Sequence, residues 1–135
     1  MTAHPAAADL TKNQALVMGA LTQADGPLSA YTILDQLRDH GFRAPPQVYR
    51  ALDKLIESGL VHRLESLNAF VACRHSDCED HKAVVFMICR NCSSVSEIPD
   101  NALSKRIKLL AQDVHFALNK STVELLGICS RCRAS

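Results

Sequence analysis

The sequence predicts an α+β protein with two structural parts. Apolar residues recur at helical spacing in three segments between residues 10 and 59, and two short strand-like runs follow them. After residue 82, further strand-like runs surround a single amphipathic segment. We therefore expect three helices and a β-hairpin in the first part, and a small sheet with one helix in the second.

The first two helices have clear start and stop signals. Thr11-Lys12-Asn13-Gln14 has the Thr-x-x-Gln form of a capping box, and Asp25-Gly26-Pro27 ends the helix that begins there. Ser29 is a good N-cap for a second helix, which we expect to continue to Gly41. Each helix carries an apolar stripe, so the two can share one core.

A third helix and a hairpin complete the first part. Pro45 and Pro46 suit the first turn of a helix, and Gly59 suits the position just after its end. The strand-like runs at residues 61–64 and 69–71 are separated by Glu65-Ser66-Leu67-Asn68, which is typical of a hairpin turn. This order of elements predicts a winged helix-turn-helix, whose third helix enters the major groove of double-stranded DNA.

Six side chains of this part are candidates for DNA contacts. Arg50 lies near the start of the third helix, where an arginine can make a bidentate contact with guanine. Tyr31 can reach a sugar, a phosphate or a thymine methyl. We expect phosphate contacts from Lys12, Arg43, Lys54 and Arg63. Net charge gives no support, because the chain carries +1 and residues 1–72 hold six basic against seven acidic side chains. The alternative is that these residues form an ordinary solvated surface.

The second part contains four strand-like runs and one helix. Residues 83–88 form a continuous apolar run, and residues 95–98, 116–118 and 123–126 form shorter ones. Pro99-Asp100 begins a helix with one apolar face, made of Leu103, Ile107, Leu110, Ala111 and Val114. A sheet of three or four strands with a single helix leaves apolar surface to cover, so we expect a homodimer.

The composition favours a cytoplasmic globular protein. Charged residues make up 21% of the chain, and no apolar run approaches the roughly 20 residues that cross a bilayer. The first residues lack the basic patch and the apolar core of a secretory signal, so no membrane association is expected. In a reducing compartment, six cysteines in a short chain are better explained as metal ligands than as disulfides.

Two Cys-x-x-Cys pairs predict a zinc site. They are Cys89 with Cys92 and Cys129 with Cys132. Each pair presents two thiolates at the separation of a tetrahedral edge, and two pairs complete a four-coordinate site. Such a site leaves no position for a substrate, so its role is structural. A thioredoxin-like redox role would need one such pair opening a helix, without a matching second pair.

A second ligand set is spread over the middle of the chain. It consists of His62, Cys73, His81 and Glu97. Two nitrogens, one sulfur and one oxygen suit tetrahedral zinc and are softer than iron or manganese prefer. His75 and Cys78 lie in the same segment, and either can replace Cys73 or His81 as a ligand. Alternatively, the histidine and the glutamate are ordinary exposed residues of the wing and of a strand.

These features resemble the ferric uptake regulator family of bacterial metalloregulators, and within it the zinc uptake regulator branch. The resemblance rests on residues 28–31, 48–52, 59–63, 65–66, 68–73, 89–92 and 127–132, in family order. It implies a homodimer with a winged-helix DNA-binding domain at 1–72, a metal-binding hinge at 73–82 and a dimerisation domain at 83–135. It also implies two zinc ions per chain, a structural ion on the four paired cysteines and a regulatory ion on His62, Cys73, His81 and Glu97.

The resemblance further implies a zinc-responsive repressor of zinc-uptake genes, which binds operator DNA as a dimer when the regulatory ion is bound. The histidine-rich run typical of the iron sensors is absent, which favours zinc over iron. Residues 116–126 also lack histidines that many relatives carry, which argues against a third metal site. Iron, manganese, nickel or peroxide sensing is the alternative. A zinc hydrolase or deaminase is not expected, because His-x-Glu and Pro-Cys-x-x-Cys are missing, and no small-molecule substrate is expected.

Overall fold

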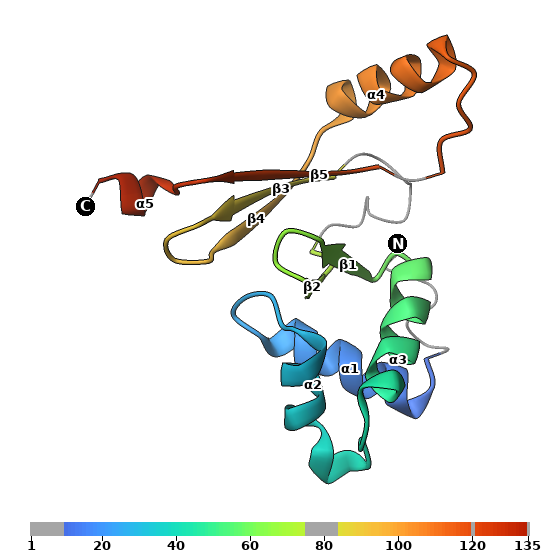
Figure 1. Cartoon of the computed structure of the whole chain (residues 1–135), viewed down its shortest axis with the longest axis vertical. Coiled ribbons are helices and arrows are strands. Elements are labelled where there is room, and N and C mark those ends of the chain that lie inside the picture. The colour runs from blue at the N-terminus through green and yellow to red at the C-terminus, as the bar shows by residue number, and fades with distance from the viewer. Residues whose placement is uncertain (1–9, 75–83, 120, 135) are drawn as a thin grey trace. The chain divides into compact units, whose positions relative to one another are not determined.

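The computed structural model describes residues 10–74, 84–119 and 121–134. The chain divides into two compact units, residues 1–76 and residues 77–135, which are described one at a time (Figure 1). Among the described residues, no helix is long and apolar enough to cross a membrane. The predicted hinge at residues 73–82 falls almost entirely outside the described residues and stays a prediction.

Helix α1 (Lys12–Gln23) begins as its sequence predicts. The Thr11 hydroxyl accepts a hydrogen bond from the Gln14 amide at 3.2 Å, and the Gln14 side chain accepts one from the Thr11 amide at 3.1 Å. This reciprocal pair satisfies two backbone donors that would otherwise lack a partner. Val17 and Leu21 form its buried side.

Helix α2 (Ala30–Gln36) is shorter than expected. Ser29 caps it, accepting from the Thr32 amide at 3.1 Å. At Leu37 the backbone leaves the helical region, and a 3-10 turn, Arg38–His40, carries the chain to Gly41. The expectation of one continuous helix to Gly41 is therefore wrong. Gly41 still marks the end, because its φ of 97° is a left-handed conformation that glycine adopts without strain.

Helix α3 (Pro45–Glu57) presents one strongly apolar face. Its buried side chains, Val48, Ala51, Leu52 and Leu55, pack in the same core as α1 and α2. Gly59, with φ of 79°, directs the chain back so that the Leu60 amide donates to the Leu55 carbonyl oxygen at 2.9 Å. The face of α3 opposite the buried side chains carries polar residues, among them Arg50, Asp53 and Lys54.

The hairpin pairs β1 (Val61–Leu64) with β2 (Ala69–Ala72) in antiparallel register. Phe70 is buried, lies edge-on to the Tyr49 ring of α3 and exchanges two backbone hydrogen bonds with Leu28. The hairpin is thus joined to both the turn before α2 and the third helix. Three helices followed by this hairpin form a winged helix-turn-helix, which confirms the predicted fold of this unit.

The second unit is a three-stranded mixed sheet with strand order β4-β3-β5. β3 (Val84–Cys89) runs antiparallel to β4 (Val95–Pro99) and parallel to β5 (Thr122–Gly127). The parallel connection contains α4 (Asn101–Asp113), whose N-cap Asp100 accepts from the Leu103 amide at 2.8 Å. A short helix, α5 (Ser130–Arg133), ends the described chain (Figure 1). The predicted α+β class is confirmed.

Residues 116–118 were expected to form a strand, and they do not. They follow a tight C-terminal cap of α4 instead. The Phe116 amide donates to the Ala111 carbonyl oxygen at 2.8 Å and the His115 amide to that of Gln112 at 3.0 Å. His115 has φ of 56°, so this is a Schellman cap with histidine in the place usually taken by glycine. The backbone of Phe116 is used by the helix end and is not available to a sheet.

Apolar side chains remain exposed in the second unit. Leu110 of α4 and the C-cap residue Val114 are 52% and 72% exposed, and Ser104 is the buried residue of that helix. Leu125 and Leu126 of β5 are also exposed. This amount of uncovered apolar surface is typical of a protein that binds a partner.

Candidate functional site

The four paired cysteines come together at one end of the sheet of the second unit. Cys89 is the last residue of β3, and Cys92 lies in the turn that follows it. The parallel register places Gly127 of β5 opposite Cys89, and the Arg90 amide donates to the Gly127 carbonyl oxygen at 2.8 Å. Cys129 lies directly before α5 as its N-cap residue, and Cys132 lies within α5. The strand pairing therefore closes the long sequence gap between the two pairs.

The sulfur atoms have the spacing of a tetrahedral metal site. All four lie within 4.8 Å of one another, and those of Cys92 and Cys129 are 3.8 Å apart. With Zn–S bonds of about 2.3 Å, the edge of a tetrahedron is about 3.8 Å long. All four are free thiols. Both the donor set and its spacing fit a tetrahedral zinc ion.

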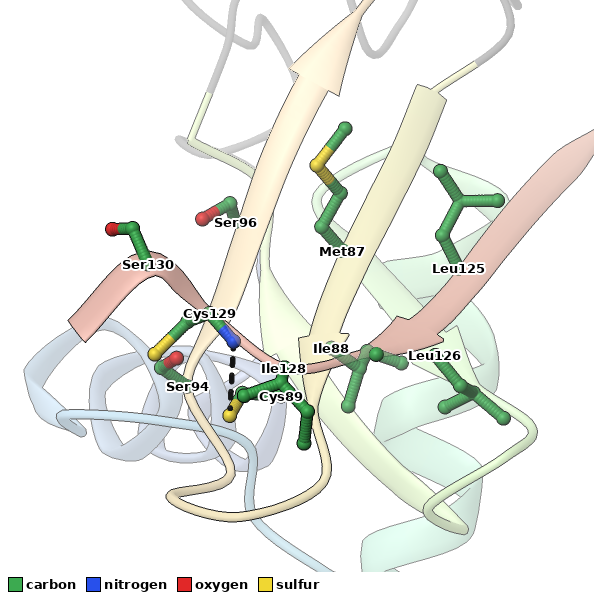
Figure 2. A pocket seen from close by; sticks show the side chains of 11 residues that line it. Met87, Ile88, Cys89, Ser94, Ser96, Leu125, Leu126, Ile128, Cys129 and Ser130 are labelled. Carbon is green, nitrogen blue, oxygen red and sulfur yellow. Dashed lines mark hydrogen bonds between the residues drawn. The ribbon is translucent and has the colours of Figure 1, made fainter. Parts of the chain in front are cut away.

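Hydrogen bonds converge on the sulfur atoms. The Cys92 and Cys129 amides donate to Cys89 Sγ at 3.5 and 3.4 Å, and Figure 2 shows the Cys129 amide directed at that sulfur. These two amides, with a smaller contribution from the Asn91 backbone amide, lower the pKa of Cys89 to about 6. Ser94, with its hydroxyl 3.2 Å from Cys92 Sγ, lowers the pKa of Cys92 as well. Both effects favour the thiolate form that binds metal.

Cys132 differs from the other three sulfurs. The Asn91 amide group donates to its Sγ at 3.2 Å and favours the thiolate. The neighbouring sulfurs of Cys129, Cys89 and Cys92, together with burial, outweigh this bond and raise the pKa of Cys132 to about 11. Hydrogen bonds with the neighbouring sulfurs favour the protonated form of Cys132. Metal binding at this sulfur would therefore release its proton.

The first unit holds two of the four other predicted ligands. His62 lies in β1 and is 8% exposed, an unusual degree of burial for an imidazole in a two-stranded wing. Cys73 directly follows β2, and its amide donates to the Leu60 carbonyl oxygen at 2.8 Å. The register places the two side chains on one face of the hairpin. Their ligand atoms lie within 4.8 Å of each other.

Cys73 takes part in a disulfide in this structure, contrary to the expectation that all cysteines are reduced. A disulfide sulfur does not act as a thiolate ligand, so metal binding by Cys73 requires its reduction. His81 lies outside the described residues, as do the alternative ligands His75 and Cys78. Glu97 belongs to the second unit, where it is half-buried in β4 opposite Phe86.

The outer face of α3 carries the leading candidates for DNA contacts. Arg50 and Lys54 are exposed, and both line an open groove of about 320 Å³ against the start of α1. Lys54 approaches Glu57 at 4.0 Å, but the two side chains are mostly exposed, so this ion pair holds the lysine only weakly. Both cations are therefore free to approach a phosphate or a base edge.

The remaining DNA candidates differ in how firmly they are held. Tyr31 is 64% exposed at the start of α2, and Lys12 and Arg43 are exposed. Arg63 of β1 has several partners. Its guanidinium lies 5.9 Å from the centre of the Phe70 ring, 3.6 Å from Glu65 and 3.3 Å from the Asn68 oxygen. This arginine is oriented by the wing itself, so it contributes to the shape of the hairpin as well as to its charge.

Gln47 has a role that the sequence interpretation did not assign. Its side-chain oxygen accepts from the Arg43 amide at 2.6 Å and from the Ala44 amide at 3.0 Å. It thereby closes the N-terminal turn of α3, where Ala44 has no side chain able to cap. The signal was present, because glutamine at the third helical position is the second half of a capping box.

Comparison with known proteins identifies the family. The sequence matches the family described as "Ferric uptake regulator family" over residues 9–126. The chain belongs to the ferric uptake regulator family. It is 39% identical over 124 residues to the zinc uptake regulation protein of Escherichia coli (strain K12). The aligned residues cover 91% of this chain and 72% of that protein.

Solved structures of this family agree with the fold. The chain superposes on holo XcZur with a TM-score of 0.83 at 39% identity, covering 93% of this chain and 87% of that one. It superposes on a zinc uptake regulator complexed with zinc and DNA with a TM-score of 0.84 at 35% identity, covering 92% and 83%. The expected family is therefore confirmed. Membership in the ferric uptake regulator family also makes the chain a regulator and not a hydrolase or deaminase.

Proposed function

We propose that this chain is a zinc-responsive transcriptional repressor, which acts in the cytoplasm, binds operator DNA as a homodimer when zinc is plentiful and represses zinc-uptake genes. The observation that carries the proposal is the buried His62 beside Cys73 on the wing. A nitrogen and a sulfur donor are thus built into the DNA-binding fold itself, and a sulfur donor favours zinc over iron or manganese. The similarity to zinc uptake regulators supports the same metal.

The first of two proposed zinc ions is structural. It is held by Cys89, Cys92, Cys129 and Cys132, whose spacing and hydrogen bonds suit it. Zinc supplies at this site a divalent charge and four directed bonds to sulfur. The residues leave no coordination position for a substrate. Ligation would fix the end of β5 and α5 to the β3–β4 turn and so stabilise a small unit with limited buried surface.

The second proposed ion is regulatory, with ligands His62, Cys73, His81 and Glu97. The proposed domains explain how it could act: residues 1–72 bind DNA, residues 73–82 form the hinge and residues 83–135 form the dimer. Ligands drawn from all three would restrain the winged helices to one separation, and a dimer binds well only when that separation matches the two half-sites. Allosteric coupling between two sites is typically about 1–3 kcal/mol, or about 5–150-fold in affinity.

Contacts within the first unit support communication between this ligand set and DNA. The Cys73 amide donates a hydrogen bond to the carbonyl oxygen of Leu60, a residue just beyond the C-terminal end of α3. Its neighbour Arg74 donates to the Thr22 carbonyl oxygen near the end of α1 at 3.4 Å. The helices α1 and α3 pack in one core. Through these contacts, a restraint on the segment after β2 would also restrain the position of α3, the helix that carries Arg50.

A metal titration tests the proposal. The reduced protein is titrated separately with zinc, iron and manganese, while binding to labelled operator fragments is followed by fluorescence anisotropy. We expect zinc alone to raise the affinity, by about 5-fold or more. If iron or manganese raised the affinity instead, the protein would still be a metal-dependent regulator, but the metal that it senses would not be zinc. Tight binding that ignores every metal and persists in chelator would overturn the regulator proposal.

A further inference from the structure

The four sulfurs of the cysteine cluster differ in how the protein supports them. Cys89 ends a central strand and accepts two backbone hydrogen bonds. Cys92 lies in the turn that follows, with the Ser94 hydroxyl at 3.2 Å. Both sulfurs are thus held by the β3–β4 connection, whose ends are paired in the sheet.

Cys132 has much weaker backbone support. It lies in α5, a helix of four residues at the end of the described chain, and among the described residues the pairing of β5 ends at Gly127. A short terminal helix frays easily, because a single turn gains few hydrogen bonds for the backbone freedom that it loses. The side chain of Asn91 crosses from the β3–β4 turn and donates to Cys132 Sγ at 3.2 Å. This bond spans 41 residues of sequence.

We propose that Asn91 is a positioning residue of the four-cysteine site, which holds Cys132 of α5 against the β3–β4 turn and stabilises its thiolate. The inference rests on the proposed structural zinc. The amide acts through the sulfur and does not itself bind the ion. Hydrogen bonds of this kind to metal ligands are worth about 10- to 100-fold in metal affinity.

The charge of the site makes such a donor useful. Four thiolates and one divalent ion carry a net charge of −2, which must be stabilised where the site is partly shielded from water. Backbone amides provide this for Cys89. For Cys132, the amide group of Asn91 provides it. Asn91 is exposed, so we expect the lower part of the range, about 10-fold.

Three variants separate this role from a general effect on folding. Asn91→Ala removes the donor. Asn91→Asp keeps the size of the side chain but replaces the donor with a negative oxygen, and Asn91→Gln keeps the amide on a longer stem. Asn101→Ala, at an exposed asparagine of α4, is the matched control. Zinc affinity is measured by competition with a chromophoric chelator. The alkylation rate of each cysteine is measured by mass spectrometry in the full-length, zinc-loaded protein.

We expect zinc affinity to fall about 10-fold in Asn91→Ala and further in Asn91→Asp, with partial recovery in Asn91→Gln. Alkylation of Cys132 should accelerate by a similar factor, while that of Cys89 changes little. Wild-type affinity and unchanged labelling of Cys132 in Asn91→Ala would overturn the inference, as would equal acceleration at all four cysteines. If the wild-type protein holds no zinc on these cysteines, the structural site itself fails, and that result is distinguishable from the failure of Asn91 alone.

Discussion

The sulfur atoms of Cys92 and Cys129 lie 3.8 Å apart, although 37 residues separate the two cysteines in sequence. The β3–β5 ladder brings them together, because its register ends with Cys89 opposite Gly127. Zinc binding and sheet formation therefore depend on the same strand pairing. A metal that joins the two pairs would stabilise the sheet, and loss of the sheet would scatter the ligands.

Cys92→Ser should therefore destabilise the second unit. We expect the loss of one zinc ion per chain and a fall in stability on the order of several kcal/mol, which lowers the melting temperature by more than about 10 °C. Circular dichroism and metal analysis check this result. Ser96→Ala, at an exposed position of β4, is the control and should keep both zinc and stability. A Cys92→Ser protein that melts like the wild type would show that the cluster is not a structural metal site.

Cys73→Ser should separate metal sensing from folding. The variant keeps the four-cysteine cluster but loses the sulfur donor beside His62, so we expect one zinc ion per chain in place of two. Its melting temperature should stay near that of the zinc-loaded wild type. Operator affinity should no longer rise with added zinc, which costs about 5- to 150-fold at saturating metal.

The same measurements on Asp25→Asn, an exposed turn position, provide the control for Cys73→Ser. All comparisons use reduced protein, since Cys73 is disulfide-bonded in this structure. If Cys73→Ser still binds operator DNA in a zinc-dependent way, another residue supplies the regulatory ligand. The same assay on His75 and Cys78 variants would then identify it.

Leu110→Asp should weaken the proposed homodimer. Leu110 is 52% exposed on the apolar side of α4, where a charge is tolerated in a monomer but is costly in a dry interface. Loss of a central contact of this kind costs about 2 kcal/mol or more, or at least about 30-fold in dimer affinity. Sedimentation velocity over a range of concentrations checks this. Gln112→Asp, on the same helix, should leave the dimer intact, and equal effects of both substitutions would argue against a specific interface at Leu110.

Local signals predicted most of the first unit. The capping box at Thr11 and Gln14, the cap at Ser29 and the apolar face of α3 each act within a few residues, and each is present. The strand expected at residues 116–118 was predicted wrongly, because the local signal for the helix cap before it was missing. A Schellman cap usually announces itself with glycine, and here His115 adopts the left-handed conformation instead.

The metal ligands show where local reasoning stops. Cys-x-x-Cys spacing is a local property, so both pairs were found, but their meeting depends on the parallel β3–β5 register, which no short segment encodes. The pairing of His62 and Cys73 follows from the hairpin register in the same way. Asn91 was missed because its partner is 41 residues away and nothing in its own surroundings points to a sulfur.

Gln47→Ala should destabilise the first unit through the start of α3. The substitution removes the oxygen that accepts from Arg43 and Ala44, which costs about 1 kcal/mol and lowers the melting temperature of this unit by about 4–8 °C. Gln47→Glu keeps an acceptor and places a negative charge at a helix N-terminus, so it should retain stability. Gln36→Ala, exposed in α2, is the control in the same urea and thermal denaturation. A stable Gln47→Ala protein would mean that water replaces the cap without cost.

Arg50→Ala should reduce both affinity and sequence discrimination, whereas Lys54→Ala should reduce affinity alone. A bidentate contact with guanine is worth about 1–3 kcal/mol, so we expect Arg50→Ala to weaken operator binding about 5- to 150-fold and to bind unrelated DNA almost as well as the wild type does. A phosphate contact by Lys54 carries no sequence information, and its loss should lower the slope of log affinity against log salt by about one. Fluorescence anisotropy with operator and scrambled duplexes at four salt concentrations separates the two roles. Arg106→Ala on α4, an exposed cation of the second unit, is the control. If Arg50→Ala changed only the salt slope, Arg50 would be a phosphate contact, and base reading would belong to another residue of α3.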